Sequence, residues 1–356
     1  MRAVTVVPGI SGSLRVDEVP EPDPALGSVL VEALAVGICG TDAEIADGGY
    51  GWPPPGRDRL ILGHESLGRV VDPGPSGFKV GEHVVGIVRR PDPAPCPSCA
   101  VGEWDMCSNG GYTERGIKAV DGFMAEGWRI EPEYAVRVDP QLGVLGVLLE
   151  PTTVVAKAWE HIAAIGRRTF WDPQTVLVVG AGPIGLLGAL GGVQAGADVH
   201  VLDRVQHVHV LDRVESGPKP ALVQQLGATY HTGAIGDLGF RPDIVLECTG
   251  VIDLVQQAVA CVSPGGIVCL TGVGPPDAAG EPVAALATKA VLGNLVVFGS
   301  VDANRRHYYR AARALAAADR GWLEQLITRR VRLKDAQAGL QREPEDIKVI
   351  VDMVQP

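Results

Sequence analysis

A glycine-punctuated turn between a strand and a helix is the most constraining feature of this 356-residue sequence. The apolar run TVLVV at 175–179 leads directly into Gly180, Gly182 and Gly185, which have the spacing G-x-G-x-x-G. The first glycine permits a tight turn, the second lets a pyrophosphate approach the backbone, and the third lets the helix pack closely on the strand. Because strand and helix patterns flank the glycines, the segment predicts a dinucleotide-binding βαβ unit.

Such a unit places an acidic residue ~20 positions after the first glycine, where it binds the adenosine ribose. The sequence offers two candidates, because VHVLDRV occurs at 199–205 and again at 208–214. Asp203 lies 203 − 180 = 23 residues after Gly180, and Asp212 lies 212 − 180 = 32 residues after it. The spacing favours Asp203, and Asp212 is the alternative if the second copy ends the strand.

An acid at this point accepts hydrogen bonds from the ribose and repels a 2′-phosphate, so we expect NAD as cofactor, with NADP possible. Arg204 or Arg213 would soften that preference. We expect three later strand-like segments to supply further contacts to the cofactor: DIVLECTG, GGIVCLTGVG and NLVVFGSV. The predicted cofactor-binding residues are Gly180, Gly182, Pro183, Ile184, Gly185, Asp203, Arg204, Thr249, Thr271, Val273, Ser300 and Val301.

The chain changes character near residue 152. Residues 1–150 contain short strand-like runs between Gly- and Pro-rich turns, which indicates a β-rich, barrel-like region. Strand and helix patterns then alternate, as in a doubly wound parallel sheet. A final helix from about residue 308 and the strand-like IKVIVDMV are expected to return to the first domain.

Composition narrows the class of protein. The 46 glycines are dispersed between apolar runs and not gathered in one tract, which indicates many tight turns rather than low complexity. A net charge of −11 without a basic block argues against nucleic acid and anionic membranes as partners. Apolar runs fall short of the ~20 residues of a membrane span, and the N-terminus lacks a signal-peptide pattern. We therefore expect a cytoplasmic protein.

Chemistry-bearing residues are concentrated in the first domain. Cys39 lies in GICGTD, His64 and Glu65 in LGHES, and Glu150 in LLEPTT. A thiolate, an imidazole and a carboxylate make a plausible three-ligand zinc site with an open position. Spacing alone does not join them, because no two motifs are close in sequence. Taken singly, Cys39 is also explained as a buried core residue, His64 as a hydrogen-bonded loop histidine and Glu150 as a carboxylate at a helix start.

Cys96, Cys99 and Cys107 form C-x2-C-x7-C in a proline-rich loop. Three close cysteines in a reducing compartment predict a closed, structural metal site, with three free surface thiols as the alternative. Such a site requires a fourth ligand. The nearest candidate is Asp92, and Glu103 is the next.

These motifs together resemble the medium-chain, zinc-dependent alcohol dehydrogenase superfamily. The resemblance is carried by GICGTD, LGHE, the cysteine loop, VVGAGPIG and the helix–strand tail. EPTTVVAKAWE, VRRPDP, GYTERGIKAVDGFMAE and GSVDANRRHY are more similar to its glucose 1-dehydrogenase branch. The similarity extends over the whole chain. It departs from the pattern at Pro93, which replaces the first cysteine of the loop, at Asp302, where the branch has asparagine, and at the VHVLDRV repeat.

The resemblance implies an α/β fold with a GroES-like, β-rich catalytic domain at 1–152 and 308–356 and a Rossmann domain at 153–307. Cys39 and His64 match the catalytic zinc ligands, and Glu150 matches the carboxylate ligand of the branch. Glu65 matches the acid beside the zinc, and Thr41 matches the hydroxyl that relays the substrate proton.

The same resemblance implies the substrate. Glu114 matches a position that binds sugar hydroxyls, Arg89 lies on a sugar-facing strand, and Asp302 matches a sugar-contacting position. With Glu150 and Asn304 they suit a polar sugar better than an apolar slot would. We therefore expect zinc-dependent oxidation of the C1 hydroxyl of a glucose-type aldose to a lactone, with hydride transfer to NAD(P), in a homo-oligomer, either dimer or tetramer.

Two alternatives compete with this interpretation. A polyol, cyclitol or amino-sugar dehydrogenase would use the same scaffold. A cofactor-binding protein without catalysis would have lost the zinc ligands, but Cys39, His64, Glu65 and Thr41 are all present.

Overall fold

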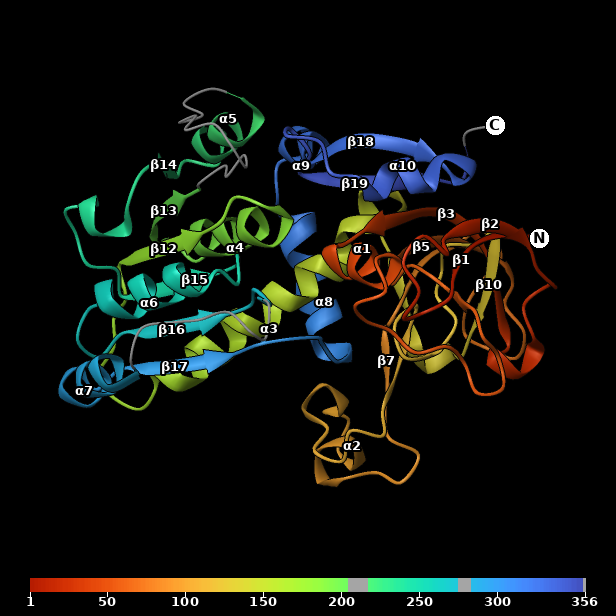
Figure 1. Ribbon diagram of the computed structural model, residues 1–356, viewed down its shortest axis with the longest axis horizontal. Helices are drawn as coiled ribbons and strands as arrows, with labels where there is room; N and C mark the ends of the chain where they lie inside the picture. Colours follow the sequence, from red (N-terminus) through yellow and green to blue (C-terminus); the bar gives the residue numbers. More distant parts are fainter. Residues whose placement is uncertain (204–216, 275–282, 355–356) are drawn as a thin grey trace. The chain divides into compact units, whose positions relative to one another are not determined.

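The computed structural model describes residues 1–203, 217–274 and 283–354, and the chain divides into two compact units (Figure 1). Unit 1 comprises Met1–Thr153 and Asp302–Pro356, and unit 2 comprises Val154–Val301. The second segment of unit 1 begins at Asp302, whereas the sequence suggested residue 308.

The main sheet of unit 1 has seven strands in the order β11-β6-β5-β3-β19-β18, with β10 paired to β3. Strand β3 alternates between buried and more accessible positions along its first half, as a strand with one core face does. The strands are β3 (Val29–Ile38), β5 (Glu65–Asp72), β6 (His83–Gly86), β10 (Gly127–Ile130), β11 (Ala135–Val138), β18 (Ile327–Arg332) and β19 (Lys348–Asp352).

Two three-stranded sheets and several short helices complete unit 1. The sheets are β2-β1-β4, with β1 (Arg2–Val6), β2 (Arg15–Glu18) and β4 (Leu60–Ile61), and β7-β8-β9, with β7 (Arg89–Arg90), β8 (Thr113–Arg115) and β9 (Ala119–Val120). The α-helices are α1 (Gly40–Ala46), α2 (Pro97–Ala100), α8 (Arg305–Ala316), α9 (Arg320–Leu326) and α10 (Ala336–Leu340). The 3-10 turns are η1 (Pro24–Leu26), η2 (Trp104–Met106), η3 (Pro132–Tyr134), η4 (Pro140–Leu148) and η6 (Leu333–Asp335).

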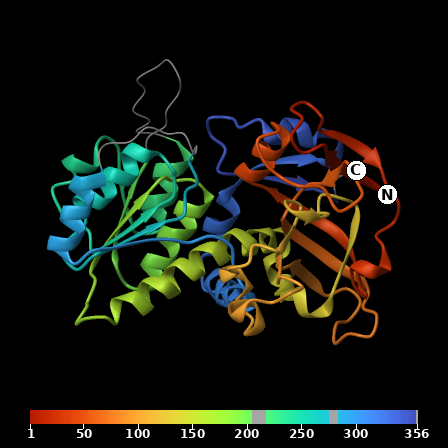
Figure 2. The ribbon, with the colours of Figure 1, turned by 60° about the horizontal axis from the view of Figure 1, so that its bottom comes forward.

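The C-terminal strand is part of the N-terminal sheet. Strand β19 pairs antiparallel with β3, with Val351 opposite Val36, and all five of its residues are buried. The blue C-terminal strands accordingly lie beside the red N-terminal ones in both views (Figures 1 and 2). Apolar side chains from both ends of the chain therefore share one core, which includes Val31, Phe123 and Trp128.

Unit 2 is built on a six-stranded parallel sheet in the order β14-β13-β12-β15-β16-β17. Figure 1 shows the strands stacked in that order, with α5 at one end and α7 at the other. The strands are β12 (Thr175–Val179), β13 (Asp198–Leu202), β14 (Thr229–His231), β15 (Ile244–Glu247), β16 (Ile267–Leu270) and β17 (Val296–Gly299). The helices are α3 (Leu149–Gly166, which begins in unit 1), α4 (Pro183–Gln194), α5 (Pro218–Gln225), α6 (Ile252–Cys261) and α7 (Val283–Gly293), with the 3-10 turn η5 (Ile235–Asp237).

The predicted fold class is confirmed. Strand β12 pairs in parallel with β13 on one side and β15 on the other, which is the strand order of a doubly wound dinucleotide-binding sheet. Among the described residues, one helical stretch, Pro140–Gly166, is long and apolar enough to cross a membrane. Of its most apolar window, 72% is buried inside the protein, so it also has the property of a core helix.

Because β19 pairs with β3, the C-terminal strand contributes to the free energy of unfolding of unit 1. Ile350 is fully buried in β19, and we expect Ile350→Ala to lower the free energy of unfolding by about 2–5 kcal/mol through the cavity it leaves. Urea unfolding followed by far-UV circular dichroism measures this. Val354→Ala is the control. Because Val354 is 67% exposed, this substitution should change the free energy of unfolding by no more than about 0.5 kcal/mol. Equal effects of the two variants would contradict this placement.

Candidate active site

The three glycines of the turn have the three properties that a bound pyrophosphate requires. Gly180 has a left-handed φ of +101°, which a side chain would strain. Gly182 caps helix α4, and a Cβ there would meet nothing within 4 Å, so the backbone is open to a ligand. A Cβ on Gly185 would lie 1.8 Å from the carbonyl oxygen of Gly180, so only glycine allows the helix so close to the turn. The turn therefore fits a dinucleotide at the N-terminus of α4, which opens with Pro183 and Ile184.

The other predicted cofactor residues follow the carboxyl ends of the parallel strands. That edge, beside the point where strand order reverses, is where ligands bind in open α/β sheets. The Thr249 backbone N–H and hydroxyl both donate to Glu247, and the Thr271 hydroxyl donates to the Glu247 carbonyl. The Ser300 hydroxyl is buried and has no hydrogen-bond partner among the described residues. Val273 and Val301 are 78% and 61% exposed.

Asp203 follows β13, and both of its carboxylate oxygens have protein partners. Oδ1 accepts the backbone N–H of Ala181 at 3.1 Å, which ties the acid to the glycine turn. Oδ2 accepts from Lys219 Nζ at 2.7 Å. The acid predicted to bind the ribose is therefore paired with a lysine, which neutralises its charge. Arg204, Asp212 and Arg213, the other residues weighed for this role, lie outside the described residues.

The candidate metal centre of unit 1 joins residues that spacing left separate. Cys39 follows β3 and caps α1, while Glu65 is the first residue of β5 and His64 directly precedes it. Their ligand atoms all lie within 4.8 Å of one another. Thr41 lies in the first turn of α1, with its hydroxyl 4.0 Å from the Cys39 sulfur. A thiolate, an imidazole and a carboxylate so arranged fit a zinc ion.

Asp42 orients this centre from α1. Its Oδ2 accepts the Cys39 backbone N–H at 2.8 Å, and its Oδ1 lies 3.5 Å from His64 Nδ1. Burial alone would lower the pKa of His64, but Asp42 and Cys39 raise it well above its usual value. Asp42 is itself fully buried, so its carboxylate acts on the imidazole with little screening by water.

A lysine from the C-terminal strand neutralises the acid of this centre. Lys348 Nζ lies 2.7 Å and 2.6 Å from the two carboxylate oxygens of Glu65 and donates to the carbonyl of Ile38. The two side chains are 3% and 2% exposed, so both charges depend on this pairing.

Glu150 lies outside the group of three but within electrostatic range of it. Burial raises the pKa of Glu150 to about 8, with His64 opposing the shift and Glu65 and Asp302 adding to it. At the start of α3 the side chain is 8% exposed. A nearby cation is the natural means of keeping this carboxyl ionised at neutral pH.

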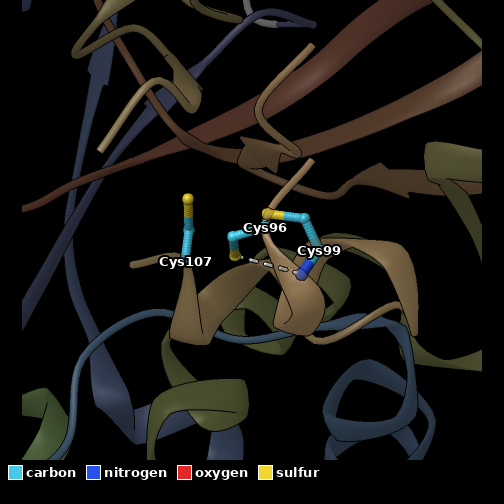
Figure 3. Close-up of side chains that lie close together, drawn as sticks. All are labelled: Cys96, Cys99 and Cys107. Atoms are coloured by element: carbon cyan, nitrogen blue, oxygen red, sulfur yellow. Dashed lines mark hydrogen bonds between the residues drawn. The ribbon is translucent and has the colours of Figure 1, made fainter. Parts of the chain in front are cut away.

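Cys96, Cys99 and Cys107 lie close together (Figure 3), and their sulfurs form a second group of possible ligand atoms within 4.8 Å of one another. Backbone N–H groups of Cys99 and Ser108 lower the pKa of Cys96 to about 6. Burial raises the pKa of Cys99 to about 11.

Neither predicted fourth ligand joins the three sulfurs. The Asp92 carboxylate accepts the backbone N–H of Ala94, and Glu103 pairs with Arg306 at 2.8 Å. Among the described residues, no further His, Cys, Asp or Glu ligand atom completes this group.

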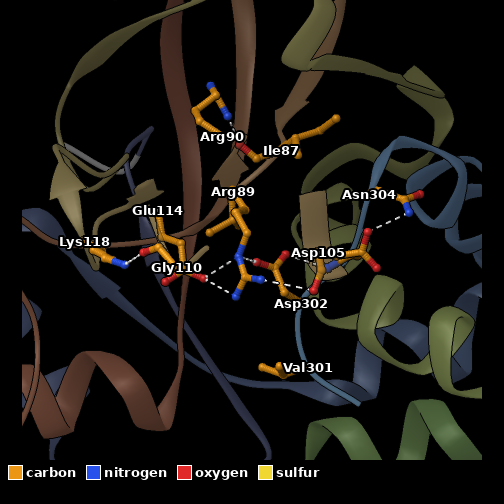
Figure 4. Close-up of polar contacts among 12 residues, drawn as sticks. Ile87, Arg89, Arg90, Asp105, Gly110, Glu114, Lys118, Val301, Asp302 and Asn304 are labelled. Atoms are coloured by element: carbon orange, nitrogen blue, oxygen red, sulfur yellow. Dashed lines mark hydrogen bonds and ion pairs between the residues drawn. The ribbon is translucent and has the colours of Figure 1, made fainter. Parts of the chain in front are cut away.

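Three of the four predicted substrate residues, Arg89, Glu114 and Asp302, form one buried ionic cluster, which Glu150 does not join. Arg89 on β7 lies between Glu114 on β8 and Asp302, at 2.9 Å and 2.5 Å (Figure 4). Its guanidinium stacks on the ring of Tyr112, 3.8 Å from the centroid. Next to it, the side chain of Asn304 donates to Asp105.

Sequence reasoning missed three residues that hold these sites together. Asp42 was visible within GICGTD. Lys348 is the charged residue directly before the apolar run VIV of the last strand. Nothing local distinguished Lys219, because the fold alone brings it to Asp203.

Comparison with known proteins agrees with this architecture. Residues 25–140 match the family described as "Alcohol dehydrogenase GroES-like domain", and residues 143–353 match "Glucose dehydrogenase C-terminus". "Glucose 1-dehydrogenase" of Methanocella arvoryzae is 37% identical over 99% of both chains, and that of Thermoproteus tenax is 39% identical over 99% of both. The solved glucose dehydrogenase of Haloferax mediterranei, in complex with NADP, Zn and gluconolactone, superposes with a TM-score of 0.90 at 31% identity over 100% of both chains.

A GroES-like unit with clustered metal ligands and a doubly wound sheet with a glycine turn define a medium-chain dehydrogenase. Within that class, this chain belongs to the glucose dehydrogenase family.

Breaking the pair between Glu65 and Lys348 should destabilise unit 1. Lys348→Met leaves a buried carboxylate without its cation, and we expect a loss of about 3–5 kcal/mol in the free energy of unfolding, measured in urea. Lys334→Met is the control, because Lys334 is exposed. Adding Glu65→Gln to Lys348→Met should restore part of the loss, and no recovery in the double variant would contradict the pairing.

Proposed function

We propose that this chain is a zinc-dependent dehydrogenase that oxidises the C1 hydroxyl of a glucose-type aldose to a lactone and passes the hydride to NAD(P). The convergence of Cys39, His64 and Glu65 within 4.8 Å carries the proposal, because a purely cofactor-binding protein has no use for such a site. Relatives named glucose 1-dehydrogenase over nearly the full chain support the substrate. In this proposal unit 1 is the catalytic domain and unit 2 binds the cofactor.

Cys39, His64 and Glu150 hold the catalytic zinc, with Glu65 adjacent to it. When bound, zinc acts as a Lewis acid that lowers the pKa of the substrate hydroxyl. Asp42 holds the imidazole of His64 and the backbone of Cys39 in place. Thr41, beside the Cys39 sulfur, takes the hydroxyl proton and passes it toward solvent.

Gly180, Gly182 and Gly185 shape the pyrophosphate site, and the strand ends that carry Thr249, Thr271 and Ser300 line the rest of the nucleotide site. The nicotinamide, when bound, accepts the hydride that leaves C1. The chain contributes position and the local electrostatic field. Arg89, Glu114, Asp302 and Glu150 supply polar partners for sugar hydroxyls.

Cys96, Cys99 and Cys107 hold a second, structural zinc ion, with Asp92 as its fourth ligand. Three convergent sulfurs support the metal. The Asp92 carboxylate must turn from the backbone of Ala94 to reach it, so we expect weaker retention than in a four-cysteine site.

Removing the thiolate tests the catalytic zinc. Cys39→Ser should lose about one zinc ion per chain by elemental analysis, and kcat/KM for glucose should fall about 1000-fold or more, because a metal Lewis acid supplies several kcal/mol of transition-state stabilisation. Cys261→Ser, on α6, is the control and should keep both zinc and activity. Full turnover in Cys39→Ser would refute the assignment.

Lys219 makes the nucleotide site tolerant of a 2′-phosphate, because it neutralises the acid that would repel one. We expect Lys219→Met to raise the KM for NADP about 10–100-fold and to change the KM for NAD less than about 3-fold, as expected for loss of one charge-assisted hydrogen bond. Titration with 2′,5′-ADP and 5′-AMP checks binding without turnover. Lys289→Met, also in unit 2, is the control. Equal weakening of both nucleotides would contradict this role.

A further inference from the structure

Unit 1 contains a cavity of about 590 Å³ that none of the sites described so far uses. Its wall is formed by β1, β2, the segment that follows β2, and β10, and it includes no residue of the candidate metal centre, of the Arg89 cluster or of the glycine turn. The volume falls within the range of ~300–1000 Å³ that is usual for small-molecule pockets. The cavity is therefore large enough to hold a small organic ligand.

Arg115, on β8, places its guanidinium in the wall of this cavity. Nη1 donates to the carbonyl of Asp121 at 3.3 Å, and Nη2 donates to the carbonyls of Leu26 and Arg129 at 3.4 Å and 2.8 Å. All three acceptor residues line the cavity, as Arg115 itself does. The residue is 2% exposed, and its Nε has no hydrogen-bond partner among the described residues.

The charge of Arg115 is only partly neutralised by the protein. The carboxylate of Glu131 lies 4.0 Å from Nη2 of Arg115, but it lies 2.9 Å from Arg90 and so belongs mainly to that residue. Burial and the charge of Arg90 lower the pKa of Arg115 to about 10, although Glu131 and Asp121 oppose the shift. Burying a cation without a close carboxylate is costly, so an anion in the cavity would stabilise Arg115.

Arg129, on β10, brings a second guanidinium to the same wall. This half-buried side chain donates from Nη1 to the carbonyl of Ser28 at 3.4 Å. Its Nε has no hydrogen-bond partner, and it forms no ion pair within the described part of the chain. The carbonyl of Arg129 accepts from Arg115, so the two arginines are held next to each other.

The acids of the lining do not neutralise these two arginines. Asp17 lies 2.8 Å from Arg15, and Asp121 lies 2.7 Å from Arg57, so both are engaged with other cations. The remaining acids of the lining are exposed to solvent: Glu18, Glu21 and Asp23. Apolar side chains form another part of the wall: Val19, Leu26 and Ile61.

We propose that this cavity binds an organic anion, whose carboxylate or phosphate group pairs with Arg115 and Arg129 and whose apolar part packs against Val19, Leu26 and Ile61. Guanidinium groups suit both kinds of oxyanion, because their N–H donors match the oxygens of a carboxylate or a phosphate. The site lies outside the residues to which the proposed function assigns a role, and it does not depend on that function.

The test is isothermal titration of the full-length protein with benzoate, phenyl phosphate and benzamide. Benzamide has the shape of benzoate without its charge, so it isolates the contribution of the anion. We expect at least one of the two anions to bind about 10-fold or more tightly than benzamide, the effect of one charge-assisted contact. The tighter of the two anions identifies the preferred oxyanion. Equal affinities for all three compounds would overturn the proposal.

Two variants locate the binding within the cavity. Arg129→Met keeps the backbone carbonyl that accepts from Arg115, and it should weaken the preferred anion about 10-fold while benzamide binding stays close to that of the parent. Leu26→Trp keeps both charges but fills part of the cavity, so it should weaken all three compounds. Arg69→Met is the control, because Arg69 is exposed, pairs with Glu32 and does not line the cavity.

Far-UV circular dichroism melting shows whether each variant is folded, and either folded variant is sufficient to decide the location. Anion binding that is unchanged in a folded Arg129→Met or Leu26→Trp variant takes place elsewhere and would overturn the inference. Since no turnover is measured, this result is separate from any failure of the proposed dehydrogenase activity.

Discussion

The antiparallel pairing of β19 with β3 is the constraint on which the rest of unit 1 depends. It places the last strand of the chain against β3, which ends one residue before Cys39, with Val349 opposite Ile38. The same pairing delivers Lys348 to Glu65, 283 positions away in sequence. Without that lysine the carboxylate would be buried beside His64 and Glu150 with no adjacent cation, and burial of an unpaired charge is among the most destabilising arrangements in a protein.

Shared charge is the common principle of the sites in this molecule. Glu65 is held by Lys348, Asp203 by Lys219, and Glu114 and Asp302 together by one guanidinium, Arg89. Each carboxylate is buried, so its cationic partner makes the contacts that water would otherwise make. Burial raises the pKa of Glu150 to about 8, so a bound metal ion would contribute most there by keeping that carboxyl ionised.

Much of the site was predictable because motifs carry their own local geometry. The turn from Gly180 to Gly185 needs its glycines whatever surrounds it, since the close approach of Gly185 to Gly180 leaves no room for a side chain. Cys96 caps the short helix that contains Cys99, so their spacing alone brings the sulfurs together. Asp203 was found by its distance along the chain, but its lysine was not, because Lys219 reaches it from a different element.

Periodicity and glycine spacing in the sequence by themselves determined the alternating α/β pattern, the β-rich first region and the position of the nucleotide turn, because these features rest on contacts between near neighbours in the chain. Only the tertiary structure decided which distant residues meet. It joined Cys39 to His64 and Glu65, supplied Lys348 from the far end, and turned Arg89, Glu114 and Asp302 into one ionic cluster. The physical reason is that charge balance in a buried site is a property of the assembled core, to which strands remote in sequence contribute side chains that no local pattern can pair.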